Sequence, residues 1–167
     1  DEEQPKEMLA AANIKYVTAD NMHLTLKFFG DVSEDKLNKI EKATNNVLKD
    51  FSQFNLRVEG MGTFPNSDHI KVIWVGIDNN SELELLEKKL DNEFNKLGFK
   101  KERNYTSHLT IGRMKNAKNK QKVQKIIQEN NEVFIGEMTV DKLHLKKSTL
   151  TSNGPIYEDL KVFPLKK

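Results

Sequence analysis

His23-Leu24-Thr25-Leu26 recurs almost unchanged as His108-Leu109-Thr110-Ile111, and we call these segments motif 1 and motif 2. Each segment alternates polar and apolar residues, which predicts a β-strand. Side chains two residues apart leave the same face of a strand, so each His points together with its Thr while Leu24 and Leu109 point away. The sequence therefore predicts two strands that each bury one face, and that together place one acid and one base across a cleft.

The two motifs lie 85 residues apart, about half the length of the chain, and each opens a unit of strand, helix, strand and strand. Helix signals predict a short helix that begins at Pro5, a helix over 33–50 capped by Ser33, a helix from Ser81 to Gly98, and a lysine-rich helix over 119–129. Alternating apolar segments predict strands over 55–61, 70–77, 133–139, 142–148 and 156–163.

The half-length repeat indicates an internal duplication, and no linker separates the halves. We expect an α+β fold in which residues 1–167 form a single domain of two pseudo-symmetric lobes. Lobes related in this way would bring the two motifs face to face.

The composition excludes several classes of protein. The chain of 167 residues has no cysteine, so disulfides, thiolate nucleophiles and cysteine-based zinc sites are excluded, which suits a reducing cytoplasm. No apolar run approaches the roughly 20 residues that span a bilayer, so we expect a cytoplasmic protein without membrane contacts. The net charge is only +2, but residues 88–125 are rich in Lys and Arg, which is compatible with a phosphate-bearing partner.

The residues of the two motifs suit phosphodiester cleavage. Unperturbed histidine titrates near pH 6.5, so of two imidazoles one can be protonated and the other neutral near neutral pH. This reaction needs a base for the attacking oxygen, an acid for the leaving oxygen, and donors for the non-bridging oxygens. His23, His108, Thr25 and Thr110 supply these groups, and Arg113 adds a planar guanidinium that matches phosphate oxygens.

The sequence resembles the 2H phosphoesterase superfamily, and within it the RNA 2′,3′-cyclic phosphodiesterase branch, also called 2′-5′ RNA ligase. The resemblance covers most of the chain and is carried by the segments 23–30, 62–66, 72–76, 107–113, 147–150 and 154–157. One such motif alone would be weak evidence for the family. Two motifs at half-length spacing, together with these flanking segments, are specific to it. Members of the family usually begin with a short apolar strand ahead of the first helix; this sequence begins at Asp1, and whether such a strand is missing stays open.

The resemblance implies an α+β fold of two lobes, in which antiparallel sheets with helices on the outside flank a V-shaped cleft lined by both motifs. It implies hydrolysis of a 2′,3′-cyclic phosphate to a 2′-phosphomonoester without metal or cofactor. By the same resemblance His23 donates a proton to the departing 3′ oxygen, His108 is the base that activates water, and Thr25, Thr110 and Arg113 hold the phosphate oxygens. The expected partner is RNA with 2′,3′-cyclic phosphate ends, tRNA-derived ends included, and the expected state is a monomer. Ligation to a 2′-5′ bond would be the reverse reaction.

Other interpretations stay open for single residues. The two motif histidines could be structural residues on half-buried strands, although a paired pattern makes that a coincidence. Phe64 could stack on a nucleobase or fill the core, Lys27 could contact RNA, and Trp74 is expected in the core. His69 and His144 alternate with lysines and are expected on the surface. No two histidines have a helical metal-ligand spacing, so we expect no metal site.

Two other functions remain as alternatives. The first is a phosphodiesterase for a small substrate, such as ADP-ribose 1″,2″-cyclic phosphate or a 2′-5′ oligoadenylate. The second is a binding module for RNA ends that lacks turnover. Intact His and Thr in both motifs argue against the second, because binding alone does not need two groups that transfer protons.

Overall fold

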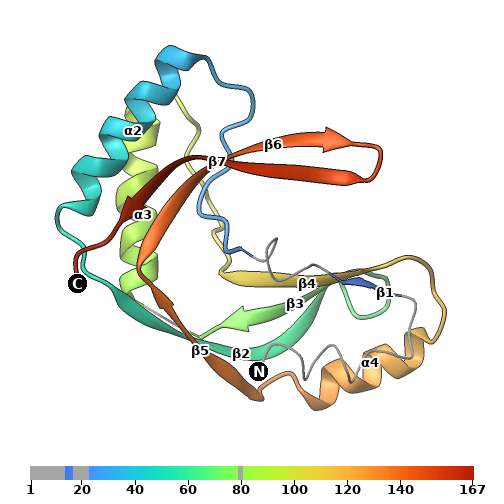
Figure 1. Ribbon diagram of the computed structural model, residues 1–167. Helices are drawn as coiled ribbons and strands as arrows, with labels where there is room; N and C mark the ends of the chain where they lie inside the picture. Colours follow the sequence, from blue (N-terminus) through green and yellow to red (C-terminus); the bar gives the residue numbers. More distant parts are fainter. Residues whose placement is uncertain (1–13, 17–22, 79–80) are drawn as a thin grey trace. The chain divides into compact units, whose positions relative to one another are not determined.

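A computed structural model describes residues 14–16, 23–78 and 81–167 (Figure 1). The helix predicted to begin at Pro5 lies outside these residues. Contacts divide the chain into two compact units, and each is described by itself. Unit 1 comprises Asp1–Thr25, Leu56–Asn79 and Thr106–Met138, and unit 2 comprises Leu26–Asn55, Asn80–Tyr105 and Thr139–Lys167.

Unit 1 is built on a five-stranded sheet in the order β1-β4-β3-β2-β5. The strands are β1 (Ile14–Tyr16), β2 (Phe54–Pro65), β3 (Ile70–Ile77), β4 (His108–Met114) and β5 (Phe134–Val140), and the unit also contains α4 (Lys120–Glu129). The first two residues of β2 and the last two residues of β5 belong to unit 2. Neighbouring strands β1 and β4, β4 and β3, and β3 and β2 are antiparallel.

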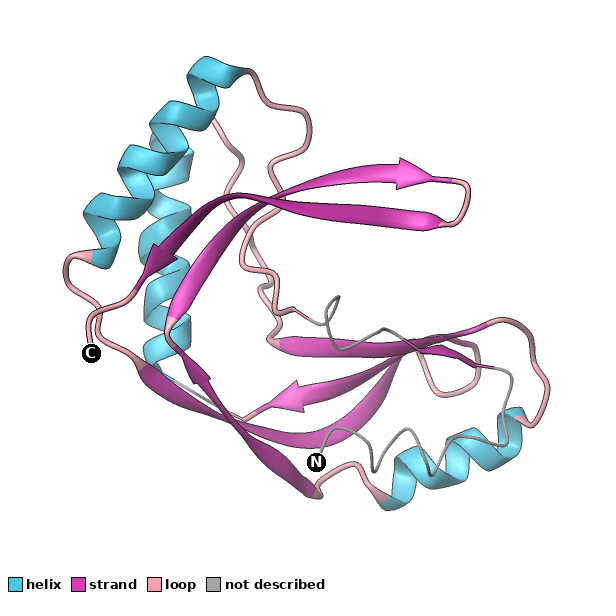
Figure 2. Cartoon of the chain, viewed as in Figure 1, coloured by secondary structure: helices cyan, strands magenta, loops and turns pink. Residues whose placement is uncertain are grey.

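One face of this sheet packs against α4 and forms the core of unit 1 (Figure 2). The alternation of β3 and β4 places their apolar side chains on this face, and α4 adds two residues one helical turn apart. The buried cluster consists of Val58, Met61, Ile70, Ile73, Val75, Leu109, Ile111, Val123 and Ile127. The opposite face of β3 and β4 is therefore available for other contacts.

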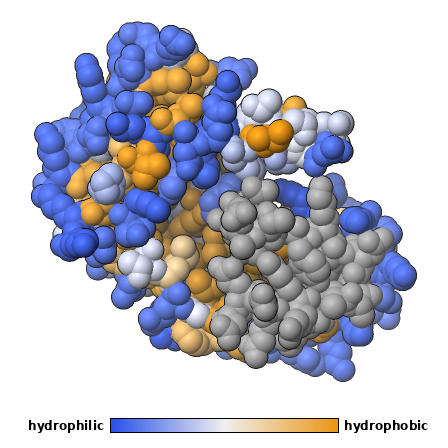
Figure 3. Space-filling view, viewed as in Figure 1, coloured by the Kyte–Doolittle hydropathy of each residue, from blue (hydrophilic) through white to orange (hydrophobic). Residues whose placement is uncertain are grey.

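Unit 2 contains α2 (Glu34–Leu48) and α3 (Ser81–Lys96) together with the hairpin of β6 (Lys142–Thr151) and β7 (Gly154–Pro164). The Oγ atom of Ser33 accepts a hydrogen bond from the backbone N–H of Lys36 at 3.3 Å, which confirms the predicted helix cap. The helix α2 packs against α3 and β7. The far half of the hairpin carries exposed apolar side chains, including Leu150 and Ile156 (Figure 3).

The strand prediction holds for motif 2 and is wrong for motif 1. Motif 2 begins β4, whereas residues 23–30 form no strand. Side chains hold this segment instead of a hydrogen-bonded ladder. Leu24 packs against the core of unit 1, and the ring of Phe29 lies 4.9 Å, centroid to centroid, from both Phe94 and Phe99 in unit 2.

The α+β class and the antiparallel sheets are confirmed, but the two units are not the two halves of the sequence. Strands from both halves are neighbours in one sheet, and unit 1 contains residues 23–25 of motif 1 together with all of motif 2. Leu24 and Leu109 even contribute to the same apolar cluster. The V-shaped cleft between lobes stays a prediction.

The other predicted elements are confirmed with small differences. The strand β2 continues to Pro65 instead of ending at residue 61, and β1 was not predicted. Gly60 has a φ of +77° at a register shift in β2. In the turn before β3, Asn66 accepts hydrogen bonds from the backbone N–H groups of Asp68 and His69.

Candidate active site

Strand β4 presents motif 2 on the sheet face that turns away from α4. Leu109 and Ile111 are buried in the core, whereas His108 and Thr110 are partly buried on the other side of the strand. This is the arrangement that the alternation predicted. The imidazole and the hydroxyl therefore lie two residues apart on one face.

A β-bulge brings Arg113 to the same face. In the ladder between β3 and β4, Trp74 lies opposite Thr110 and Val72 lies opposite Arg113. On β3, one residue lies between Trp74 and Val72. On β4, two residues lie between their partners Thr110 and Arg113. Paired residues of a ladder share a face, so the extra residue moves Arg113 to the face of His108. In a regular strand, a spacing of five residues would place the two side chains on opposite faces.

Two aromatic rings pack against the imidazole of His108. The ring centroid of His108 lies 5.4 Å from that of Trp74 and 5.0 Å from that of Phe64. Phe64 is 40% exposed, so the interpretation of Phe64 as a residue that fills the core is wrong. Gly62 lies directly opposite Trp74 in the ladder, and the absence of a side chain there leaves room for the indole.

Burial lowers the pKa of His108 below its ordinary value. The cause is desolvation, because the packed environment disfavours the charged imidazolium. A histidine with a lowered pKa is neutral at neutral pH and can accept a proton. This property matches the role of a general base.

Motif 1 joins motif 2 in unit 1 through its apolar residue, since Leu24 packs against the cluster that contains Leu109. His23 and Thr25 flank Leu24 and are partly buried. The structure thus places His23, Thr25, His108, Thr110 and Arg113 in one compact unit.

The position of Lys27 does not fit its interpretation as an RNA contact. Its ammonium lies 2.9 Å from Oδ1 of Asp91 and donates a hydrogen bond to the carbonyl oxygen of Lys100. Its side chain is only 7% exposed. We therefore remove Lys27 from the set of proposed RNA contacts, because a phosphate would have to displace the buried carboxylate of Asp91.

Sequence reasoning missed Trp74, which was expected in the core. Trp74 pairs with Thr110 and belongs to the face of motif 2, whereas Ile73 and Val75 on either side of it are buried in the core. The signal was available in the alternation of the strand, since Trp74 is out of phase with both core residues.

The remaining histidines lie outside this group. His69 is exposed, as expected. In His144, the Nδ1 atom lies 3.1 Å from a carboxylate oxygen of Asp159, whose other oxygen lies 2.9 Å from the ammonium of Lys146. These contacts lower the pKa of Asp159, with the Lys146 hydrogen bond as the main cause. Within the described part of the chain, no three His, Asp or Glu side chains are grouped as metal ligands would be.

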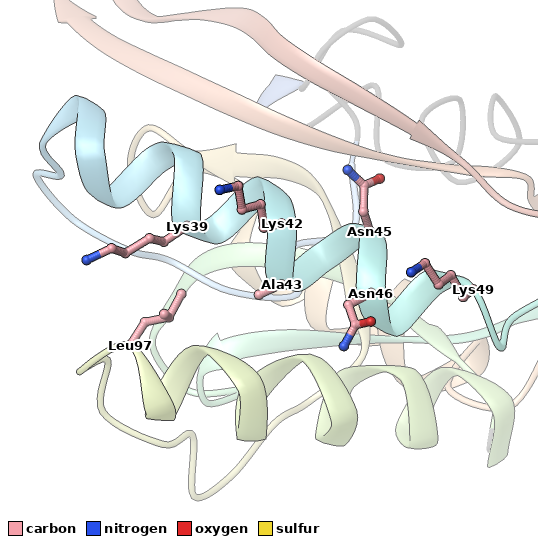
Figure 4. Close-up of a pocket in the computed structure, with 7 residues that line it drawn as sticks. All are labelled: Lys39, Lys42, Ala43, Asn45, Asn46, Lys49 and Leu97. Atoms are coloured by element: carbon pink, nitrogen blue, oxygen red, sulfur yellow. The ribbon is translucent and has the colours of Figure 1, made fainter.

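A shallow hollow of about 540 Å³ lies beside α2 and contains none of the predicted site residues (Figure 4). Its lining consists of Lys39, Lys42, Ala43, Asn45, Asn46, Lys49 and Leu97. The labelled side chains point in different directions along the helix (Figure 4), and Lys39 lies 3.3 Å from the carboxylate of Asp35. The hollow therefore does not gather its polar groups around a common point.

Comparison with known proteins places the chain in a family. Residues 3–150 match the model of the 2′-5′ RNA ligase superfamily. The chain belongs to this superfamily. Within the described residues, no helix has both the length and the apolar character needed to cross a membrane.

Similar proteins share both sequence and fold. The RNA 2′,3′-cyclic phosphodiesterase of Methanothermobacter thermautotrophicus is 44% identical over 156 residues, which cover 93% of this chain and 85% of that protein. The protein of the same name from Methanocaldococcus jannaschii is 43% identical, with 93% and 87% covered. The crystal structure of E. coli LigT complexed with 3′-AMP has a similar fold, with a TM-score of 0.77, 24% identity, and 99% and 91% of the two chains covered.

Proposed function

We propose that this protein is an RNA 2′,3′-cyclic phosphodiesterase that hydrolyses a terminal cyclic phosphate to a 2′-phosphomonoester. The observation that carries the proposal is the common sheet face of His108, Thr110 and Arg113, which depends on the bulge in β4. The names of the relatives in Methanothermobacter and Methanocaldococcus support the same substrate.

His108 is the base in this reaction. It takes a proton from water as the water oxygen attacks phosphorus, and its lowered pKa supports this role because the neutral form is the one required. The bond between phosphorus and the 3′ oxygen breaks, and His23 donates a proton to that oxygen. The products are a 2′-phosphate and a free 3′-hydroxyl, so atoms and charges balance.

Thr25, Thr110 and Arg113 bind the non-bridging phosphate oxygens. Hydroxyl and guanidinium donors that are already oriented stabilise the charge that develops on these oxygens in the transition state. Phe64 is half-exposed beside His108, so its free surface is available to a nucleobase next to the cyclic phosphate. No step requires a metal or cofactor, and the protein acts as a monomer in the cytoplasm.

Ligation to a 2′-5′ bond would reverse these steps, with a 5′-hydroxyl of a second RNA in place of water. The alternatives are hydrolysis of a small cyclic nucleotide or 2′-5′ oligoadenylate, and binding of RNA ends without turnover.

The test is incubation with 2′,3′-cyclic nucleotides, oligoadenylates and RNAs, including tRNA fragments, that end in a cyclic phosphate. Chromatography then separates 2′- from 3′-phosphate products. We expect 2′-phosphates from the RNAs at the highest kcat/KM. Exclusive formation of 3′-phosphates, or binding without turnover, would contradict the proposal.

A further inference from the structure

The segment that leaves motif 1 is held by a buried ion pair. The ammonium of Lys27 lies 2.9 Å from Oδ1 of Asp91 on α3, and the two side chains are 7% and 9% exposed. The same ammonium donates to the carbonyl oxygen of Lys100, which lies between α3 and β4. A lysine side chain is usually flexible and exposed, so a lysine whose end is fixed by a buried carboxylate and by a second acceptor is unusual.

Further polar groups surround the ion pair of Lys27 and Asp91. The Oδ2 atom of Asp91 accepts a hydrogen bond from the backbone N–H of Glu102 at 3.1 Å, and the carboxylate of Glu102 lies 3.8 Å from the ammonium. Burial, followed by the charges of Asp91 and Glu102, raises the pKa of the neighbouring Glu87. Lys27 therefore lies beside three acidic side chains of unit 2, those of Asp91, Glu102 and Glu87.

The position of Lys27 in the chain connects this cluster to motif 1. Lys27 follows Thr25 by two residues and His23 by four. Two residues of extended chain span at most about 7 Å, so a fixed Lys27 restricts where the backbone of Thr25 can lie. Residues 23–30 have no strand ladder that could do this instead.

We propose that Lys27 is a positioning residue for motif 1. Its ion pair with the buried Asp91 and its hydrogen bond to the carbonyl oxygen of Lys100 fix the backbone so that His23 and Thr25 keep their geometry toward the cyclic phosphate. The inference rests on the proposed function and adds a residue that acts through the motif without touching substrate. Small displacements of catalytic groups cost up to about 100-fold in rate, so loss of this anchor should lower kcat more than it changes KM.

The test separates positioning from simple stabilisation. Lys27→Met alone would leave a buried carboxylate unpaired and destabilise the fold, so the main variant is Lys27→Met/Asp91→Leu, which replaces the ion pair by apolar groups. The matched control is Lys36→Met, which removes a lysine that donates to the carbonyl oxygen of Leu97 in the same unit. If the double variant does not fold, Asp91→Asn retains an acceptor and weakens the anchor more gently.

Three measurements are made on each variant: thermal unfolding, kcat and KM on RNA with a cyclic phosphate end, and amide hydrogen exchange at residues 23–27. We expect the double variant to melt near the wild type, to lose about 10–100-fold in kcat with KM within about twofold, and to exchange faster at Thr25. Lys36→Met should keep the wild-type kcat. Asp91→Asn should show a smaller loss of kcat in the same direction.

Two outcomes would overturn the inference. A stable double variant with wild-type kcat and exchange would show that the ion pair only stabilises unit 2. A higher KM at unchanged kcat would show that Lys27 contacts the substrate directly. If the wild-type protein has no activity on cyclic phosphates, the proposed function fails, and the hydrogen exchange of residues 23–27 still tests the anchor.

Discussion

Gly62→Ala should disturb the aromatic packing around His108 while leaving the backbone intact. The φ angle of Gly62 lies outside the left-handed region, so alanine suits the backbone there. An added Cβ would lie 2.2 Å from Cζ2 of Trp74 and 2.4 Å from Cη2, distances that real atoms do not tolerate. The indole must move, and with it the ring that now lies 5.4 Å from the imidazole of His108.

Two effects should follow. Overpacking of this kind costs about 1–3 kcal/mol. At about 2–4 °C per kcal/mol for a chain of this size, the melting temperature should fall by roughly 2–12 °C. Movement of the indole also exposes His108 to water and raises its pKa toward the ordinary value. Because a base must be neutral, the acidic limb of the profile of kcat/KM against pH should move to higher pH.

The assay is thermal unfolding by circular dichroism together with a pH profile on RNA with a cyclic phosphate end. The matched control is Gly62→Ala in a Trp74→Leu background. In this background the indole is absent, so Gly62→Ala should lower the melting temperature little. The effects of Gly62→Ala and Trp74→Leu on stability should therefore not be additive. If Gly62→Ala alone melts like the wild type and keeps its acidic limb, the indole does not lie against Gly62, and the reasoning is refuted.

Four further predictions concern the proposed chemistry and the buried acid. His108→Ala and His23→Ala should each lower kcat by about 100-fold or more, and the first should remove the acidic limb of the pH profile while the second removes the basic limb; loss of the opposite limbs would exchange their roles. Arg113→Met should lower kcat/KM by about 10–100-fold, the usual effect of losing a hydrogen bond to a charged group, and an unchanged value would exclude Arg113 from phosphate binding. Glu87 has a raised pKa, so the folded state prefers its protonated form and loses stability as pH rises above the ordinary carboxyl value; Glu87→Gln should therefore raise the melting temperature at pH 8 but not at pH 4, whereas the exposed Glu84→Gln should change neither. Full activity should persist in excess EDTA, and activity that returns only with a divalent ion would contradict metal-free catalysis.

The sequence predicted those parts of the fold in which local pattern and tertiary contacts agree. Helix α2 begins after Ser33 because its hydroxyl caps the first turn, and β3 spans the predicted residues because its alternation matches a buried face. Motif 2 forms a strand for the same reason.

Motif 1 has the same alternation as motif 2 but different contacts. A period of two shows which side chains share a side in an extended segment, and it does not show whether another strand is available as a partner. Lys27 was misinterpreted because its charge suggested RNA, whereas its buried partner Asp91 comes from α3, 64 residues later. Such long-range partners are not visible in one sequence.

The bulge in β4 shows how the spacing of two functional residues in a sequence can be interpreted. His108 and Arg113 lie five positions apart, an odd interval that an undistorted strand cannot reconcile with a shared face. Deleting Ile111 would make the ladder regular and shorten this interval to four positions, so Arg113 would stay opposite Val72 on the face of His108, while the core would lose a buried side chain. The irregular residue is thus a spacer, and an odd interval between two chemically paired side chains in a predicted strand is itself a sign that one residue between them is extra to the ladder.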